Sequence, residues 1–309
     1  MALNSSAVRG EDYIWITLPN LLAFAFNWSL LGALMVQLYT YHISFRDRLG
    51  FKILVYSVFI LDLAQTCSAT YDAAQWFGYG WGDPSVLEKG YTTFLNVPLL
   101  TSIIGAAVQT FFGWRIWSFS KSNILFGFII SMALTQLGGS IATSYFLFPR
   151  EKASPVSSIH QSVGVRLGTS AAVDIVIAGC MTYYLLKSRN EFSMRTNAVV
   201  TKLVRLTIET GTITAAAAII DLVFFLTLEH NSLHQLSGVN LSKLYTNSLL
   251  MLFNNRLLAR REAPLVETGS NSNPTDRSWQ RQGWNAVGNR QYSDIQSSLE
   301  TFQAASGKI

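Results

Sequence analysis

Long apolar stretches separated by short polar joints recur seven times along this chain of 309 residues. A bilayer core of about 30 Å is crossed by about 20 apolar residues of α-helix, and a helix satisfies its own backbone polar groups in lipid. The pattern therefore predicts an all-α fold, a seven-helix transmembrane bundle over residues 15–41, 51–77, 94–119, 124–148, 163–186, 203–228 and 239–258.

The sequence on either side of these stretches is polar. Residues 1–14 are expected to be an extracellular N-terminus without a separate cleavable signal peptide. After Arg261 the chain turns to Ser, Asn, Gln, Gly and charged residues, with little that could form a core. We therefore predict a membrane domain over 15–258 and a disordered cytoplasmic tail over 259–309.

The composition is typical of a membrane protein. Hydrophobic residues make up 50% and charged residues 13% of the chain, against about 25% charged residues in an ordinary soluble domain. The net charge of +5 is carried mainly by the polar joints and the tail, where it suits anionic lipid headgroups. The expected partner is the lipid bilayer, and no nucleic acid partner is indicated.

The positions of Lys and Arg predict the orientation, because cytoplasmic joints are enriched in both. One set of joints carries 13 of them and the opposite set carries 6. This places the N-terminus outside and the C-terminus inside, in the plasma membrane or a secretory-pathway membrane. Glycosylation sequons at Asn4 and Asn240 both fall on the expected outer side, which predicts a glycoprotein.

The most suggestive chemistry is a group of polar residues deep inside the predicted spans. By helical rise, Asp62, Asp174 and Asn247 lie roughly 12 to 17 Å from the nearer end of their spans. An ionised carboxylate at that depth costs at least about 2.5 to 3.5 kcal/mol, so each must be protonated, hydrogen-bonded or paired. The candidate intramembrane polar site comprises Asp62, Asp174, Glu209 and Asn247.

Two interpretations of this group stay open. The first is a site for a proton, a cation or a cationic ligand where the second, fifth, sixth and last spans converge. The second is interhelical hydrogen bonding that stabilises the bundle. Ion pairing is not expected, because Arg166 and Lys243 are predicted within about a turn of the outer surface. We expect Lys243 to extend towards the headgroups there rather than to carry a retinal Schiff base.

No cofactor fingerprint, catalytic residue or dedicated metal site is predicted from the sequence. One enzymatic alternative rests on His230 and His234, which are spaced by four residues, and on His160 in another outer joint. Together these side chains could hold zinc, as in some membrane hydrolases. Small residues predict close helix contacts: Gly138 and Gly139 in the fourth span, and Gly164 and Gly168 in the fifth.

The last third of the membrane domain carries an ordered set of polar residues. The most specific run is Lys243-Leu244-Tyr245-Thr246-Asn247-Ser248-Leu249-Leu250, followed by Asn254-Asn255-Arg256 and preceded by Ala172-Val173-Asp174 in the fifth span. With these residues, the region from about 167 to 256 resembles the fungal domain of unknown function 6534. This is a family of seven-span membrane proteins from mushroom-forming basidiomycetes. The resemblance implies an architecture and a fungal origin, and it implies no activity.

Three hypotheses for function follow. The leading one is a receptor-like or sensory membrane protein that binds a small-molecule ligand at its outer face or upper bundle and is not an enzyme. The alternative is a proton- or cation-coupled transporter that uses Asp62, Asp174 and Glu209 as a relay. The weakest is the zinc-dependent membrane hydrolase.

Overall fold

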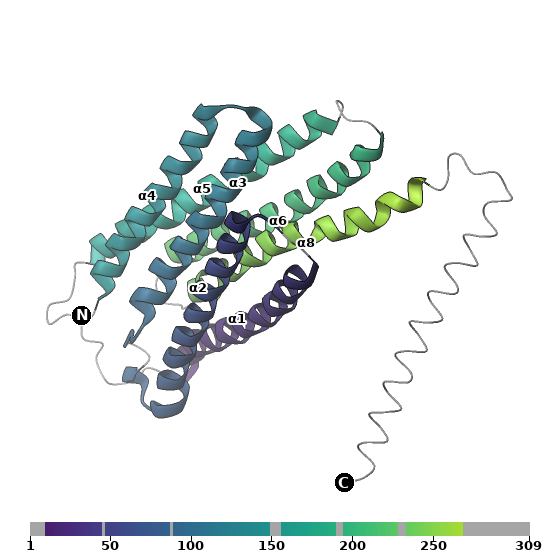
Figure 1. Cartoon of the computed structure of the whole chain (residues 1–309). Coiled ribbons are helices and arrows are strands. Elements are labelled where there is room, and N and C mark those ends of the chain that lie inside the picture. The colour runs from purple at the N-terminus through teal and green to yellow at the C-terminus, as the bar shows by residue number, and fades with distance from the viewer. Residues whose placement is uncertain are drawn as a thin grey trace, which may run out of the picture. The chain divides into compact units, whose positions relative to one another are not determined.

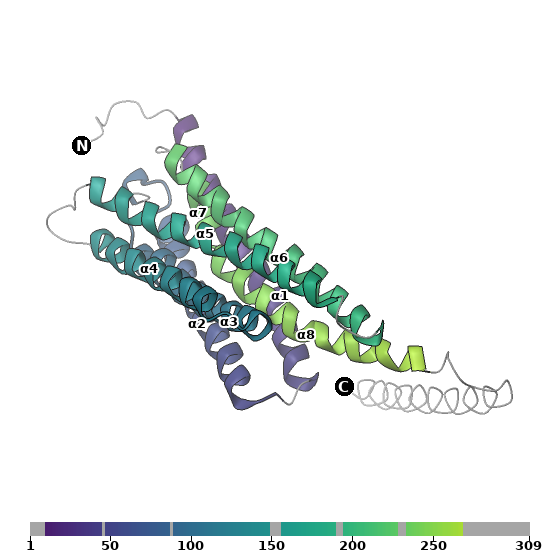
Figure 2. The ribbon, with the colours of Figure 1, turned by 90° about the horizontal axis from the view of Figure 1, so that it is seen from above.

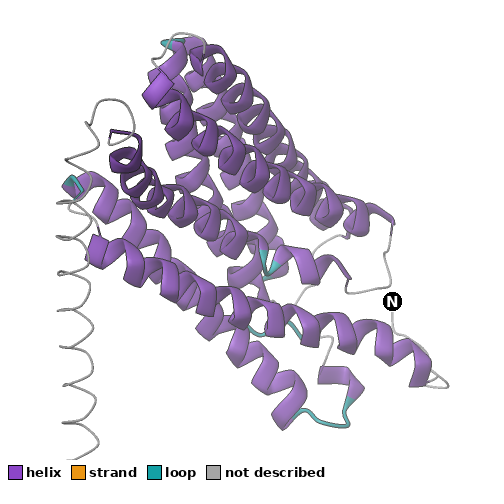
Figure 3. Ribbon diagram, turned by 90° about the vertical axis from the view of Figure 1, so that its right-hand side faces the viewer, coloured by secondary structure: helices purple, strands orange, loops and turns teal. Residues whose placement is uncertain are grey.

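The computed structural model describes residues 10–44, 47–86, 89–148, 156–189, 194–227 and 233–267, and these are helical with no strand among them (Figures 1 and 3). The long helices are α1 (Gly10–Ser44), α2 (Leu49–Ala74), α3 (Thr101–Ser120), α4 (Asn123–Leu147), α5 (Val156–Arg189), α6 (Met194–Thr227) and α8 (Leu241–Glu267). A short helix, α7 (Leu233–Gly238), precedes α8.

Each predicted span corresponds to one long helix, so the all-helical prediction is confirmed. Five of the described helices are long and apolar enough to cross a membrane: they correspond to α1 to α5, with α2 extended by a π-helical turn, Gln75–Tyr79, and α3 preceded by another, Leu95–Leu100. In α6 the apolar part is the shorter segment Gly211–Thr227. These helices characterise a membrane protein, while passage of α6 and α8 through the bilayer stays a prediction.

The surface of the long helices is rich in large apolar side chains. Val36 of α1 is 67% exposed, Ile60 of α2 is 62% exposed and Ile124 of α4 is 87% exposed. Exposing these side chains to water would be unfavourable, because apolar surface in contact with water costs about 25 cal/mol per Å². In a bilayer the same side chains contact lipid tails without that cost.

Local sequence accounts for the ends of several helices. Lys121 ends α3 in the left-handed conformation, with φ of 55°, and its N–H donates to the Trp117 carbonyl. Ser122 then caps α4 by accepting from the backbone N–H of Leu125. Pro98 lies in a π-helical turn, Leu95–Leu100, that leads into α3. The missing N–H of a proline is tolerated near the start of a helix.

Helix α8 lies at the centre of the bundle's apolar core. Its residues Leu249, Leu250 and Phe253 pack in one cluster with residues of α1, α2, α3, α5 and α6. Figure 2 shows α8 running alongside α1 and α6. The last helix therefore contributes six of the sixteen buried residues of this cluster, more than any other helix.

One of the predicted small-residue contacts is close and another is not. A Cβ at Gly139 of α4 would lie 3.2 Å from the backbone nitrogen of Arg166 and 3.4 Å from the carbonyl oxygen of Ser162, both on α5. Gly138, Gly164 and Gly168 have no neighbouring atom within 4 Å of such a Cβ. The close contact expected at Gly164 and Gly168 is therefore absent, and Gly139 is the glycine that lets α4 and α5 approach.

The chain divides into two compact units, Met1–Leu257 and Leu258–Ile309, and the following description concerns the first. Helix α8 continues to Glu267, beyond the predicted end of the last span at 258. Residues 1–9 and 268–309 lie outside the described residues, so the extracellular N-terminus and the disordered tail stay predictions.

Candidate functional site: two buried polar clusters on the last helix

A buried ion pair joins α8 to α2. The Nζ atom of Lys243 lies 2.8 Å from Oδ1 of Asp62, and both side chains are 0% exposed. The same ammonium donates to the Asp62 backbone carbonyl at 2.8 Å and to Oε1 of Gln65 at 3.1 Å. An ammonium has three donors, and all three are used. Oδ2 of Asp62 is buried and has no hydrogen-bond partner.

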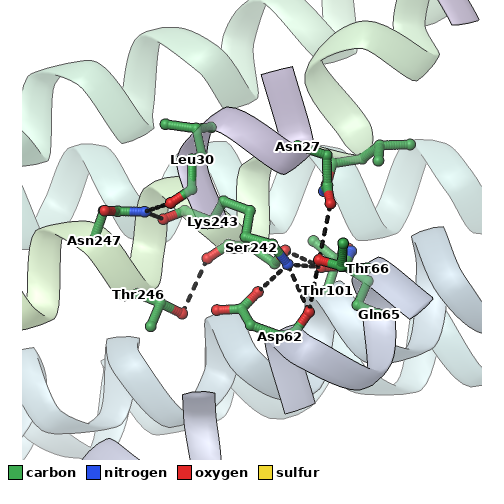
Figure 4. A network of polar contacts seen from close by, with 11 residues as sticks. Asn27, Leu30, Asp62, Gln65, Thr66, Thr101, Ser242, Lys243, Thr246 and Asn247 are labelled. Atoms are coloured by element: carbon green, nitrogen blue, oxygen red, sulfur yellow. Dashed lines mark hydrogen bonds and ion pairs between the residues drawn. The ribbon is translucent and has the colours of Figure 1, made fainter. Parts of the chain in front are cut away.

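Neutral side chains surround this pair and hold it in place (Figure 4). Ser242 donates to Oε1 of Gln65, and Nε2 of Gln65 donates to Thr101 of α3 at 2.9 Å. Oγ1 of Thr66 lies 3.0 Å from the Asp62 carbonyl and 2.9 Å from Oδ1 of Asn27 on α1. We call Asp62, Gln65, Ser242 and Lys243 the ion-pair cluster.

The predicted role of Lys243 at the headgroups is wrong, as is the expectation that no cation could reach Asp62. Helix α7 and the turn at Val239 and Asn240 precede α8, and α7 contacts both α1 and α6. Val239, Leu241 and Ser242 are themselves buried. Lys243 therefore begins below a covered end of the bundle and points inward. Counting the helical rise gives a depth along the axis but not the direction of a side chain.

Three asparagines of the last span attach α8 to α1. The Nδ2 atoms of Asn240, Asn247 and Asn254 donate to the carbonyls of Ala23, Leu30 and Gln37 at 3.2, 3.3 and 2.8 Å respectively. Donors and acceptors both recur every seven residues, which is close to two helical turns. Both series ascend together, so α1 and α8 run in the same direction. We call these three contacts the asparagine ladder.

A second polar cluster lies on another side of α8, around Asp174 of α5. Nε2 of Gln109 on α3 donates to Oδ1 of Asp174 at 3.0 Å, and the Tyr245 hydroxyl donates to Oδ2 at 2.5 Å. The Tyr245 oxygen also lies 3.1 Å from Oγ of Ser170. Asp174 is 4% exposed, and in the described part of the chain its carboxyl group contacts neutral donors rather than Lys or Arg.

A small cavity adjoins this carboxyl group. It has a volume of about 20 Å³, counted as the space open to the centre of a water molecule, and about 10–15 Å³ in that measure is enough for one water. Its polar lining comes from α3, α5, α6 and α8: Gln109, Asp174, Thr214, Tyr245 and Ser248. Oε1 of Gln109 is buried and has no hydrogen-bond partner. We call this site the Asp174 cavity.

The predicted site residues are thus divided between two places. Asp62 and Asn247 belong to one network, because Nδ2 of Asn247 donates to the Lys243 carbonyl at 2.8 Å. Asp174 lies in the separate cluster around its cavity. The side chain of Glu209 on α6 lies outside the described residues. The single polar layer is therefore replaced by two clusters that α8 connects.

Arg166 is a second cation that is more deeply buried than expected. It is 5% exposed on α5, and its charge interacts with that of Asp221 on α6, which is 1% exposed. Arg166 was predicted close to the outer surface from its position near the start of its span. Packing of α5 against α4 at Gly139 covers this segment.

The structure shows the surroundings of two histidines of the predicted zinc site and of one predicted glycosylation site. His160 and His234 both pack on the ring of Phe225, with centroids 5.2 and 6.0 Å away, and the described residues contain no group of three metal-binding side chains. His230 and Asn4 lie outside those residues. The Asn240 amide is 6% exposed and donates to Ala23 and Leu236 carbonyls, so a glycan there would have to break both contacts.

Two open grooves lie at the end of the bundle that carries Arg48 and Arg115. One of about 840 Å³ is lined by Arg48, Phe51, Phe111 and Trp114 among others, and a neighbouring one of about 260 Å³ shares the three aromatic residues. Both are far larger than the Asp174 cavity. Their ionisable lining residues are Asp47 and Arg48 in the larger groove and Arg115 in the smaller one.

Several residues of both clusters are missed by reasoning from the sequence. Lys243 was assigned elsewhere, and Tyr245, Gln65 and Ser242 carried no specific prediction. A usable signal was present, because Asn240, Asn247 and Asn254 recur at heptad spacing in an otherwise apolar span. Such spacing places all three on one helix face and predicts a polar seam towards a neighbouring helix.

The long apolar helices of the fold are those of a helical membrane protein. Within this chain, residues 170–257 match a family described as a family of unknown function (DUF6534). This match confirms the resemblance based on the Lys243–Leu250 run, while the fungal origin and the number of spans stay predictions. No curated protein and no solved structure matches the chain.

Proposed function

We propose that this chain is a receptor-like, seven-span membrane protein whose resting bundle is held by the ion pair between Asp62 and Lys243. The observation that carries the proposal is the 2.8 Å contact between two charged side chains that are both 0% exposed. The proposal assigns the chain no catalytic role, and it places the protein in the plasma membrane or a secretory-pathway membrane.

The energetics of such a pair favour a switch over a simple structural support. Removing two charges from solvent is expensive, and a buried ion pair is often no more stabilising than apolar residues of the same volume. Breaking it by losing one partner is strongly unfavourable. The contact therefore has two well-separated states, paired and unpaired. A ligand that binds one state better than the other shifts the population between them.

The position of the pair makes this switch relevant to signalling. It joins α2 to α8, the helix that contributes the most residues to the apolar cluster shared with α1, α2, α3, α5 and α6. Movement of α8 relative to α2 would also change the surroundings of Phe51 and Phe253, which line the groove at the Arg115 end. The asparagine ladder, in which α1 and α8 are parallel, supports an odd number of spans and termini on opposite sides.

Distance measurements between spin labels test the proposal. Labels at Ile53 on α2 and Met251 on α8, both exposed, are introduced after Cys67 and Cys180 are replaced by Ala, with the protein in lipid nanodiscs. We expect one distance distribution for the parent protein and a second population in Asp62→Asn. Asp83→Asn, which changes an exposed carboxylate between α2 and α3, is the matched control. An unchanged distribution in Asp62→Asn would overturn the switch.

The same labels give a ligand screen. A small molecule that acts through the pair should produce the second population in the parent protein and have little further effect in Asp62→Asn. A compound that binds, as judged by thermal stabilisation, but leaves the distances unchanged would show that ligand binding and the pair are not coupled.

The Asp174 cavity favours a second candidate, a proton- or cation-coupled transporter. Its support is a buried carboxyl group with neutral partners beside a cavity where four helices meet. Reconstituted proteoliposomes should then show substrate uptake driven by an imposed proton or sodium gradient, and Asp174→Asn should abolish it. Absence of gradient-driven uptake across substrate classes would count against a transporter and leave the receptor proposal intact.

A further inference from the structure

The Asp174 cavity combines three features that are rarely found together without an occupant. Asp174 is 4% exposed, its carboxyl group accepts from the neutral side chains Gln109 and Tyr245 among the described residues, and Oε1 of Gln109 is left without a hydrogen-bond partner. A buried polar atom without a partner costs about as much as a lost hydrogen bond. Gln109 and Asp174 both line the same space.

Among the residues that line the cavity, none carries a positive charge to balance Asp174. The buried Arg166 of α5 lies outside this lining, and its charge interacts with Asp221 and with Tyr245. In the ion-pair cluster the ammonium of Lys243 compensates Asp62, whereas the cavity lining contains no Lys or Arg. Of the helices around the cavity, α3 and α6 present the neutral side chains Gln109 and Thr214, and α8 presents Tyr245, which is the only titratable group near Asp174 in the lining. One positive charge, supplied from outside the chain, would neutralise the site.

The chemistry of the lining selects the kind of cation. Every polar side chain that lines the cavity offers an oxygen, and none offers sulfur or imidazole nitrogen. Carboxylate, carbonyl and hydroxyl oxygens suit hard cations, and transition metals prefer softer ligands. A single carboxylate balances one charge, so a divalent ion would leave an excess positive charge in the bundle. The space admits an ion about the size of one water molecule.

Existing hydrogen bonds leave acceptor oxygens available in the cavity. Thr214 uses its hydroxyl hydrogen on the Gly211 carbonyl at 3.1 Å, so the lone pairs of its oxygen remain. Nε2 of Gln109 donates to Oδ1 of Asp174 at 3.0 Å and to the Tyr245 hydroxyl at 3.5 Å, which leaves Oε1 as an acceptor. Gly211 itself adds no side chain to the lining, and its α-carbon faces Ala178 of α5.

From this geometry we infer that the Asp174 cavity is a binding site for one sodium ion, with Asp174 as the anionic ligand. The Gln109 amide oxygen and the Thr214 hydroxyl oxygen complete the site with Ser248 and Tyr245. The inference does not depend on the Asp62–Lys243 switch, because the two clusters share no residue.

Equilibrium binding of ²²Na⁺ to the purified full-length protein in detergent micelles is the direct test. We expect one saturable sodium ion per chain at pH 8 and at least tenfold weaker binding in Asp174→Asn. The matched control Asp83→Asn should bind like the parent protein. Lowering the pH should weaken binding, because protonation of Asp174 removes its charge. Absence of saturable sodium binding to the parent protein would overturn the inference and indicate that the cavity holds water only.

Thermal unfolding gives a second readout that does not rely on a variant. Sodium chloride is compared with choline chloride at equal ionic strength, since choline is too large for a cavity of this volume. Sodium at about five times its Kd should raise the midpoint by about 2–4 °C for a domain of about 200 residues. An equal effect of potassium would overturn the assignment to sodium, and no difference between sodium and choline would overturn the cation site itself.

Discussion

Each of the two polar clusters that α8 contacts contains a buried carboxyl group, but the two carboxyl groups have different partners. Asp62 is compensated by a cation of the chain itself at 2.8 Å, whereas Asp174 is held by a tyrosine hydroxyl and a glutamine amide beside an open volume. Lys243 and Tyr245 are two positions apart, and successive residues on a helix are rotated by about 100°. On one face α8 thus contributes Lys243 to a closed charge pair, and on the nearly opposite face it contributes Tyr245 to the cluster around Asp174 of α5.

The ion-pair cluster is therefore a contact that is either formed or broken. The Asp174 cavity is a site that can exchange one bound species for another. The ion-pair cluster has no adjoining cavity among those described, and all donors of its ammonium are used. The Asp174 cavity has room for one small species and acceptors that face it. Substitutions in the first cluster should therefore change stability and conformation, and substitutions in the second should also change ion and pH dependence.

The largest effect should come from removing one partner of the ion pair. Lys243→Met leaves the Asp62 carboxylate buried without a cation, which should lower the free energy of unfolding by about 3 to 5 kcal/mol. The double variant Asp62→Leu/Lys243→Met removes both charges and should recover most of that loss. Unfolding in mixed micelles with increasing denaturing detergent measures both. If the double variant is as unstable as the single one, the pair is not the source of the effect.

Tyr245→Phe should have the next largest effect and should act on the other cluster. It deletes the hydroxyl that contacts Oδ2 of Asp174 and Ser170, and a hydrogen bond to a charged group contributes about 1.5 to 3 kcal/mol. The same unfolding measurement applies. Tyr183→Phe, at a tyrosine that is 60% exposed on α5, is the matched control and should change stability little. Equal effects at both positions would show that the Tyr245 hydroxyl is not specifically engaged.

Two neighbouring glycines of α4 test whether the close packing of α4 against α5 contributes to stability. Gly139→Ala places a methyl group 3.2 Å from the Arg166 backbone, so α4 and α5 must separate, at a cost of about 1 to 3 kcal/mol. Gly138→Ala has open space around it and should be neutral or stabilise the helix by up to about 1 kcal/mol. Thermal midpoints of the two variants should therefore move in opposite directions, and a similar loss in both would contradict the close packing at Gly139.

The smallest effect concerns the asparagine ladder on the ion-pair side. Asn254→Leu removes the contact to the Gln37 carbonyl, and interhelical hydrogen bonds in membrane proteins average about 0.6 kcal/mol. Stability should fall by about that amount, with no change in sodium binding. A double-mutant cycle is not possible with a backbone acceptor, so Leu substitution of Asn240 and Asn247 in turn provides the comparison. A loss that grows with each added substitution supports a ladder of similar contacts.

The helices of this protein are predictable from sequence because their signal is local. Apolar residues in runs of span length indicate a helix in lipid whatever its neighbours are, and all seven predicted spans correspond to long helices. The extra helix α7 was missed because six residues, Leu233 to Gly238, carry too little periodic pattern. The later end of α8 at Glu267 was missed because its last residues are polar and charged.

The partners inside the bundle are not predictable in the same way. Depth along a helix follows from counting residues, and it correctly indicated that Asp62 and Asp174 lie deep. Which face each one occupies relative to other helices depends on rotation and tilt, and these are set by packing. Lys243 was therefore placed at the surface although its side chain is 0% exposed. Asp62 and Lys243 are 181 positions apart, a separation that no local pattern spans.

The asparagine ladder has a consequence for how the protein is made. Its acceptors in α1 emerge early in synthesis, while the donors, Asn240 just before α8 and Asn247 and Asn254 within it, lie 217 positions later in the chain. The face of α1 that later contacts α8 must therefore be in contact with lipid or with a chaperone until nearly the whole polypeptide has been inserted. The contacts between α1 and α8 can form only after α8, the last helix, has been inserted.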